Sequence, residues 1–163
     1  MTKEDEKMME KRDALILSHL RNDARETLTR MSRKTSIPVS TIYDRLKAQE
    51  SSIIKRYTAL LDFNELGYNA RCKVILKIAR EKKEALEKFL ISHISVNSLY
   101  KINNGFDFLV EGIFKSIKES EDFLEALEIK FGVKTKQVYY IIDDIKRESF
   151  MSDPELLGIL GLV

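Results

Sequence analysis

The dipeptide Asn104-Gly105 constrains the fold of this chain more than any other short feature, because alternating apolar and polar runs flank it on both sides. Asn and Gly tolerate the positive φ angles that a tight hairpin turn requires, so this pair is the strongest short hairpin signal. The flanking runs "SVNSLYKI" and "FDFLVEGIF" therefore predict two antiparallel strands that meet at residues 104–105.

Four further segments surround this hairpin and have strand or helix periodicity. In chain order, they are a strand at residues 70–79, a helix at 81–94, a helix at 116–132 and a strand at 133–145. The second helix begins with Ser116 and Glu119 at capping-box spacing, and it ends at Gly132. The order strand, helix, strand, strand, helix, strand predicts a ferredoxin-like βαββαβ domain over residues 69–145.

Two helices on one side of such a sheet leave its second face uncovered. The alternation places five apolar or aromatic side chains on that face: Leu99, Leu109, Ile113, Val138 and Tyr140. A face with this many apolar residues needs a cover, so we expect a second subunit to bind there.

Residues 1–56 have the pattern of three short helices. The first covers residues 11–21, Thr27 caps the second, and Pro38 suits the first turn of the third because its φ is preset for a helix. Two short helices, a turn of a few residues and a third helix predict a helix-turn-helix, so the chain is expected to be α+β. A three-helix packing unit with no role in DNA binding remains an alternative on these features.

The third helix has two different sides. Helical spacing places Val39, Ile42, Leu46 and Gln49 inward. The later helix of a helix-turn-helix enters the major groove of DNA, so the outward polar residues are expected to contact base edges. These residues are Ser40, Thr41, Tyr43, Asp44 and Lys47.

Charge is distributed unevenly along the chain. Residues 27–56 hold seven Lys/Arg against two Asp/Glu, a net charge of +5, whereas residues 57–163 have a net charge of −2. A basic segment next to an acidic remainder indicates an anionic partner for that segment alone. We expect five cations to hold DNA phosphates: Arg30, Arg33, Lys34, Lys55 and Arg56.

The remaining segments join or follow these two domains. Residues 53–63, "IIKRYTALLDF", are rich in β-branched and aromatic residues and predict a strand that leaves the helical unit. We assign residues 57–68 to the connecting strand or hinge between the two domains. Residues 146–163 form a C-terminal extension with an apolar segment after Pro154. The sequence leaves open whether this extension packs on a neighbouring subunit or is half ordered.

Composition limits location and chemistry. The single Cys72 cannot form an internal disulfide, and no apolar run approaches the ~20 residues that span a bilayer, so a cytoplasmic location is expected. The sequence contains no His/Cys/Asp cluster with metal-ligand spacing and no glycine-rich phosphate loop. We therefore predict no metal, no cofactor and no enzymatic activity.

The run at residues 22–46, "NDARETLTRMSRKTSIPVSTIYDRL", followed by "IIKRYTALLDFNELGY", resembles the Lrp/AsnC (feast/famine) transcription regulators. Seven residues match the pattern that this family has at the start of its second domain: Ile54, Tyr57, Ala59, Asp62, Leu66, Gly67 and Tyr68. The resemblance covers residues 11–145. This chain departs from the family at three positions where the family usually has glycine: Ser36 and Asn104 occupy two of them, and the third lies in the interdomain junction, which reads "QESSII".

This resemblance implies a sequence-specific DNA-binding regulator with an effector-sensing (RAM-type) second domain. It implies a homodimer joined through the sheets, often built into a larger oligomer such as an octamer, and modulation by an amino acid. The effector would bind near the hairpin, at Asn104, Gly105 and Asp107. Two alternatives share the architecture: a non-specific DNA-wrapping protein and a sirohaem-decarboxylase-like enzyme. Those enzymes rely on His and Arg at the hairpin, where this chain has neither in "LYKINNGFDF".

Overall fold

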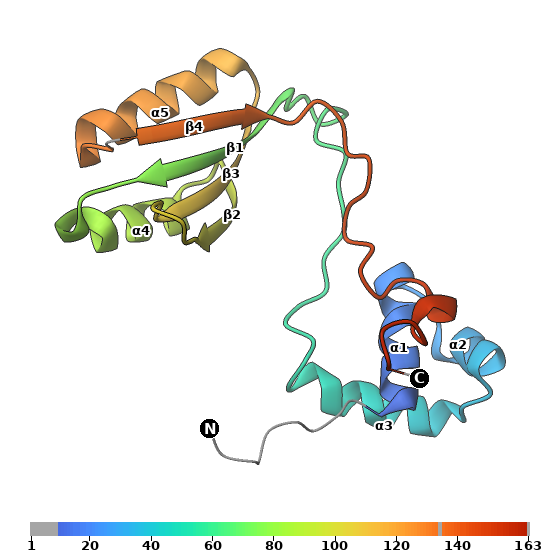
Figure 1. The fold of residues 1–163 in the computed structure, drawn as a ribbon. Helices are drawn as coiled ribbons and strands as arrows, with labels where there is room; N and C mark the ends of the chain where they lie inside the picture. The colour runs from blue at the N-terminus through green and yellow to red at the C-terminus, as the bar shows by residue number, and fades with distance from the viewer. Residues whose placement is uncertain (1–9, 134, 163) are drawn as a thin grey trace. The chain divides into compact units, whose positions relative to one another are not determined.

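A computed structural model describes residues 10–133 and 135–162, which form two compact units (Figure 1). The helical unit consists of the described residues up to Ala59 together with those from Ile145 onward. The sheet unit consists of the described residues from Leu60 to Asp144.

Three helices form the frame of the helical unit: α1 (Lys11–Asn22), α2 (Leu28–Thr35) and α3 (Val39–Glu50). Their shared core consists of Ile16, Met31, Ile37 and Ile42, all of which are buried. The Thr27 hydroxyl accepts the Arg30 amide at 3.3 Å and so caps α2 as predicted. The predicted helix-turn-helix is therefore confirmed.

The turn between α2 and α3 contains a serine with left-handed backbone. Ser36 has φ 58° and ψ 20°, a conformation that costs other residues more than it costs glycine. It is one of the positions at which the resembling family usually has glycine. This serine keeps the tight turn, and the turn is correspondingly strained.

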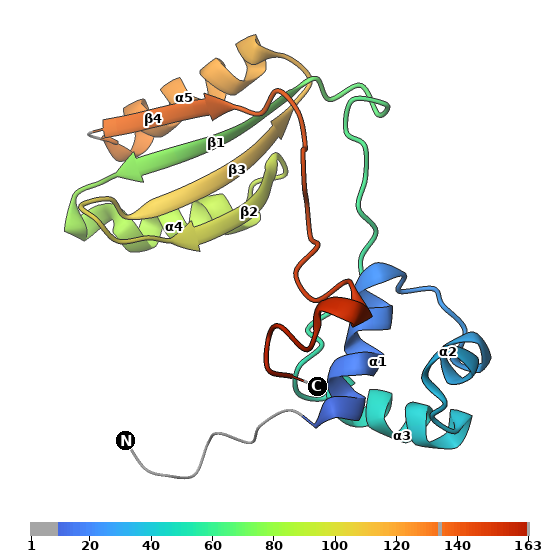
Figure 2. The same ribbon diagram turned by 45° about the vertical axis from the view of Figure 1, so that its right-hand side comes forward.

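The C-terminal extension packs within the helical unit, against α1 (Figures 1 and 2). It contains a short 3-10 helix, η2 (Pro154–Leu156), whose start is capped by Asp153. Leu157 is completely buried, and the Arg21 guanidinium binds the Phe150 carbonyl and Glu148. The chain's own α1 thus takes the place that the sequence analysis left to a neighbouring subunit or to partial order.

The sheet unit has the predicted ferredoxin-like order of elements. In chain order these are β1 (Ala70–Lys77), η1 (Arg80–Lys82), α4 (Lys83–Ser92), β2 (Val96–Lys101), β3 (Phe108–Phe114), α5 (Ile117–Phe131) and β4 (Thr135–Tyr140). The strands lie in the order β2-β3-β1-β4, every neighbouring pair is antiparallel, and α4 and α5 cover the same face (Figure 2).

The turn and helix-capping residues of this unit have the conformations that the sequence predicts. Asn104 (φ 59°) and Gly105 (φ 85°) both have positive φ in the turn between β2 and β3. The Ser116 hydroxyl accepts the Glu119 amide, and α5 ends at Gly132 in left-handed conformation. Between the helices and the sheet lies an apolar core of fourteen buried residues, with Leu76, Leu86, Phe108 and Leu124 among the most deeply buried.

Three of the five residues predicted for the uncovered face are on the helix-covered face instead. Leu99, Val138 and Tyr140 pack against the core between helices and sheet. Leu99 pairs with buried Val110 across the strands, and the β4 residues pair with buried positions of β1 in the same way. In the β4 segment "QVYYII", apolar or aromatic residues stand at both odd and even positions, so alternation could not show which side chains face the helices. In β2, a register irregularity between Val96 and Ser98 reverses the parity.

The uncovered face is consequently more polar than predicted. Leu109 and Ile113 do lie on it, together with Ile75, while Tyr100 and Tyr139 are half exposed there. Charged or polar side chains of the strands share this face with them, among them Arg71, Lys73, Glu111 and Gln137.

The predicted connecting strand at residues 53–63 is wrong for the single chain. This segment is extended and has no strand pairing, although the Tyr57 hydroxyl donates to the Glu50 carboxylate at 2.9 Å. A strand is defined by hydrogen bonds to a neighbour, and β propensity alone does not supply that neighbour.

Candidate nucleic-acid interface

The outward side of α3 is a polar, exposed surface. Ser40, Tyr43, Asp44 and Lys47 are all exposed and repeat at helical spacing, and Thr41 next to them is partly buried. The opposite side of the helix is anchored by Ile42 and Gln49, which are 0% and 4% exposed. Val39, predicted to face inward, is 41% exposed because it is the first residue of α3 and lies in a turn at the surface.

Ion pairs with α1 hold the inner side of α3 in place. Arg45 binds Glu10 at 2.7 Å and Asp13 at 2.9 Å, and the Gln49 amide donates to the same Asp13 carboxylate at 2.9 Å. Hydrogen bonds to Asp13 and then Glu10 raise the pKa of Arg45 above its ordinary value. Arg45 therefore orients α3 against α1, a role that the sequence analysis did not identify.

The predicted phosphate-binding cations fall into two groups. Arg33, Lys55 and Arg56 are exposed, and Lys55 donates to the Ser52 carbonyl at 3.4 Å. Arg30 and Lys34 are also exposed, but both are paired with one carboxylate, that of Glu26.

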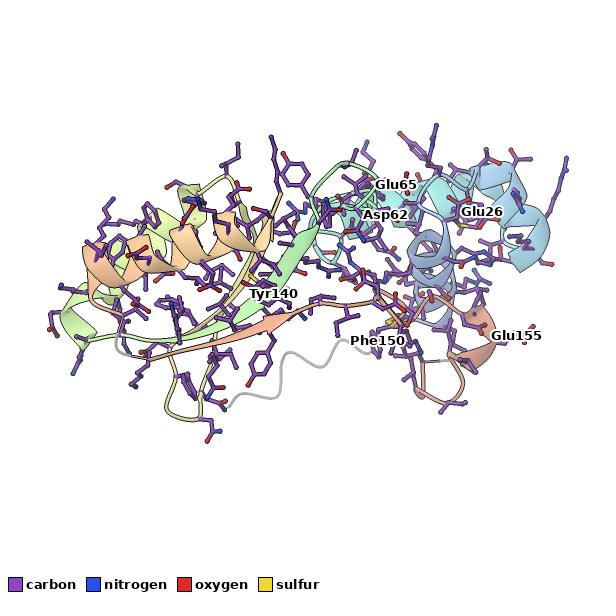
Figure 3. The ribbon with its side chains drawn as sticks, turned by 90° about the horizontal axis from the view of Figure 1, so that it is seen from above. Glu26, Asp62, Glu65, Tyr140, Phe150 and Glu155 are labelled. Carbon is purple, nitrogen blue, oxygen red and sulfur yellow. The ribbon has the colours of Figure 1, made fainter. Side chains whose placement is uncertain are left out.

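Glu26 is a buried carboxylate among cations between α1 and α2 (Figure 3). Its side chain is 2% exposed and lies 2.7 Å from the Lys34 ammonium, 3.6 Å from Arg30 and 2.9 Å from His19 Nδ1. Burial favours a raised pKa for Glu26, but hydrogen bonds from Lys34 and His19 outweigh it and lower the pKa. The i,i+4 spacing of Glu26 and Arg30 is a signal that sequence analysis could have used.

The predicted effector residues do not form one cluster of side chains. Asn104 and Gly105 are exposed at the tip of the hairpin, whereas Asp107 is 8% exposed. The Asp107 carboxylate accepts the Ile78 amide at 2.9 Å and pairs with Lys83 at the start of α4. Burial favours a raised pKa for Asp107, but these partners lower it. Asp107 thus fastens the hairpin to the end of β1.

A second charged network lies on the uncovered face of the sheet. Glu111 is 7% exposed; one carboxylate oxygen binds Arg71 at 2.6 Å, and the other accepts from Asn97 at 2.7 Å and Ser98 at 2.9 Å. Arg71 also binds Asp144 at 2.6 Å. These pairs join residues far apart in sequence, and no local pattern predicts them.

Residues 10–133 and 135–162 contain no group of three His, Cys, Asp or Glu side chains placed to hold a metal ion. Over the same described residues, none of the helices has both the length and the apolar character needed to cross a bilayer.

Comparison with known proteins identifies relatives along most of the chain, although no family model matches it. The chain is 28% identical to the HTH-type transcriptional regulator FL11 of Pyrococcus horikoshii, over 75% of this chain and 82% of that protein. It is 24% identical to an uncharacterised HTH-type transcriptional regulator of Pyrococcus abyssi, over 90% of this chain and 100% of the relative.

Solved structures share the fold of both units. The transcriptional regulator NMB0573 of Neisseria meningitidis, solved as a complex with L-Met, matches with TM-score 0.78 and 22% identity, over 85% of this chain and 93% of that one. LrpC of B. subtilis matches with TM-score 0.74 and 21% identity, over 82% of this chain and 94% of that one. The predicted resemblance to the Lrp/AsnC regulators is confirmed.

Proposed function

We propose that this chain is a sequence-specific DNA-binding transcriptional regulator, as a relative of HTH-type regulators with the fold of the Lrp/AsnC proteins. The observation that carries the proposal is the exposed polar side of α3, braced from behind by the pairing of Arg45 with α1. A helix held this rigidly can present donors and acceptors to base edges in a major groove of ~12 Å width.

The proposed contacts divide into base contacts and phosphate contacts. Ser40, Thr41, Tyr43, Asp44 and Lys47 would contact bases, with Asp44 accepting from a cytosine amino group. Exposed cations on and around α2 and α3 would bind phosphates, which adds affinity but no sequence choice: Arg33, Lys55 and Arg56 directly, and Arg30 and Lys34 once they are released from Glu26.

We infer that an amino acid modulates this binding. The solved neighbour from Neisseria meningitidis is a complex with L-Met, which makes L-methionine the first ligand to test on this chain. The exposed hairpin tip at Asn104 and Gly105 can offer backbone groups to such a ligand. Asp107, whose carboxylate already has partners within the unit, would hold the tip in position.

We also propose that two copies associate through the uncovered sheet face. Ile75 and Leu109 on this face, next to Ile113, which is already buried, would gain cover from the second copy, and Tyr100 and Tyr139 would be buried with them. Two DNA-binding units in such a dimer would read half-sites ~10 base pairs or a multiple apart. A larger assembly such as an octamer would extend this arrangement. The proposed regulator would act in the cytoplasm, without a cofactor and without enzymatic activity.

A binding titration tests the proposed function. The DNA upstream of the protein's own gene is compared with scrambled DNA of equal length, at two salt concentrations. A sequence-specific regulator is expected to bind the native fragment ~1000-fold more tightly than the scrambled fragment, or better. We expect Tyr43→Ala to cost ~1–3 kcal/mol on the native fragment and little on the scrambled one.

Lys88→Ala on α4 is the matched control, since Lys88 is an exposed lysine of the sheet unit whose ammonium binds Glu84 of the same helix at 2.7 Å. It should bind both fragments as the unchanged chain does. Equal affinity for both fragments would favour the DNA-wrapping alternative over a sequence-specific regulator. No binding at low salt would refute DNA binding altogether.

A further inference from the structure

The C-terminal tail, residues 148–162, forms a separate layer within the helical unit, next to α1 (Figures 1 and 2). None of the described tail residues belongs to the apolar core that the three helices share. The tail also has backbone hydrogen bonds of its own, since the Leu160 and Leu162 amides donate to the Leu157 carbonyl at 3.1 and 3.2 Å. The tail is therefore a small folded segment that lies against a core of which it is not a part.

One side of α1 receives this tail. Ala14, Leu17 and Ser18 repeat there at helical spacing and are 0%, 7% and 0% exposed. Ala14 and Leu17 are not members of the shared three-helix core, and η2 contacts α1, so the tail is the element that covers them. Small side chains at two of the three positions leave room for Leu157, which follows η2 and is fully buried.

Arg21, one turn further along the same side of α1, holds the start of the tail. Its guanidinium donates to the Glu148 carbonyl at 2.8 Å, to the Glu148 carboxylate at 3.1 Å and to the Phe150 carbonyl at 3.1 Å. A planar guanidinium with several donors selects a segment whose acceptors match its geometry. This side of α1 thus recognises two features of the tail, which are a buried leucine and a pair of backbone carbonyls.

The tail is held weakly in this position. Glu148 and Met151 have left-handed backbone, with φ 52° and 61°, which strains residues other than glycine. The side chains of Arg21 and Glu148 are 40% and 56% exposed, so solvent screens their ion pair. Large apolar side chains of the tail also remain exposed, among them Phe150, Leu156 and Ile159.

Ser18 is suited to a surface that the tail covers only part of the time. Its hydroxyl is fully buried and has no hydrogen-bond partner among the residues that the structure describes. A buried hydroxyl without a partner loses its hydrogen bonds to water, a cost that alanine at the same position would not have. The hydroxyl recovers these bonds when the tail lifts from α1.

We propose that Ala14, Leu17, Ser18 and Arg21 form a peptide-docking site on α1 that the tail occupies reversibly. The tail opens while the three helices stay folded, as a segment with few buried contacts does. The open site accepts the same segment from a second copy of the chain, because that segment carries the same leucine and carbonyl groups. The site does not depend on DNA binding, so its tests can succeed or fail independently of the proposed function.

A fluorescently labelled peptide of residues 148–162 probes the site by anisotropy, with full-length chains as receptors. In the parent, the chain's own tail competes with the peptide. Leu157→Ala in the chain frees the site, so this variant should bind the peptide at least tenfold more tightly than the parent does. Leu157→Ala in the peptide should abolish binding, whereas Leu156→Ala in the peptide, at a half-exposed position, should not.

Arg21 is tested in the same assay. In the chain that carries Leu157→Ala, Arg21→Ala should weaken peptide binding at least tenfold, whereas Arg25→Ala, at an exposed position after α1, should leave it unchanged. If the folded Leu157→Ala chain does not bind the peptide, the proposal is refuted. If amide NMR spectra show that this variant loses its three-helix fold, the tail is an integral part of that fold, and the proposal is refuted as well.

Hydrogen exchange in the unchanged chain tests whether the tail opens by itself. The Leu160 and Leu162 amides should exchange at least tenfold faster than the Ile42 amide of α3, which donates to the Pro38 carbonyl at 3.0 Å, after correction for intrinsic rates. Equal protection of the tail and α3 would mean that the tail opens only when the helical unit unfolds. That result would rule out a reversible docking site.

Discussion

Glu26→Gln removes a buried negative charge next to two cations proposed to bind phosphate. The side chains of Lys34 and Arg30 are 43% and 68% exposed, so screening by solvent leaves their pairs with Glu26 worth at most ~1 kcal/mol each. Glutamine can retain a neutral hydrogen bond to His19, which is weaker than a charge-assisted one by ~1 kcal/mol. We expect the free energy of unfolding of the helical unit to fall by ~1–2 kcal/mol.

DNA binding should change in the opposite direction. Once Glu26 is neutral, Lys34 is released to a phosphate, and each phosphate neutralised steepens the slope of log K against log salt by ~0.9 per subunit. At ~0.1 M salt, one added contact of this kind is worth about tenfold in affinity. The gain should be equal on native and scrambled DNA, because phosphates carry no sequence information.

The assay is a salt-titrated binding measurement with Lys34→Ala made in both backgrounds. We expect Lys34→Ala to have an effect below twofold in the parent and to abolish the gain in Glu26→Gln. Glu84→Gln on α4 is the control: it removes the same charge from an exposed pair with Lys88 and should leave the slope unchanged. If Lys34→Ala costs the same in both backgrounds, Glu26 does not hold Lys34 back and the reasoning is wrong.

Three further substitutions test other parts of the structure. Leu157→Ala should lower the free energy of unfolding of the helical unit by ~2–5 kcal/mol, as measured in urea, because it leaves a cavity against α1, whereas Leu156→Ala at a half-exposed position should cost much less. Ser36→Gly should raise the melting temperature by relieving left-handed backbone, a gain of up to ~1 kcal/mol, while Ser51→Gly, at ordinary helical φ, should not. Asp107 has a lowered pKa in the folded state, so its stabilising contribution is present above the ordinary carboxyl pKa and is lost as the pH falls through the folded value. In Asp107→Asn, the free energy of unfolding of the sheet unit should therefore depend less on pH between ~5 and ~2 than in the parent.

The parts of the fold that local signals control were predictable from sequence. The Thr27 and Ser116 caps and the Asn104-Gly105 turn each depend on a few neighbouring residues, and each formed as expected. The faces of β2 and β4 depend on register, which is set by the neighbouring strands. Val138 and Tyr139 are adjacent and both apolar or aromatic, so the sequence contains no information about which one faces the helices.

The candidate site was only partly predictable for a related reason. Helical spacing identified the exposed side of α3, but the partners that restrain it come from α1, more than thirty residues earlier in the case of Asp13 and Arg45. The network of Glu111 and Arg71 likewise joins two strands that are neighbours only in the folded sheet. Ion pairs between distant segments depend on the tertiary structure and leave no periodic signal.

These pairings change how the charge of the helical unit should be interpreted. Residues 27–56 have a net charge of +5, yet Arg45 is turned toward α1, and Arg30 and Lys34 share Glu26. Within the described residues, the cations of this stretch that have no carboxylate partner are Arg33, Lys47, Lys55 and Arg56. Fewer free cations means less affinity from counterion release. In a regulator built this way, the polar side of α3 must supply a larger share of the binding free energy than composition indicates, which favours discrimination between DNA sequences over indiscriminate wrapping.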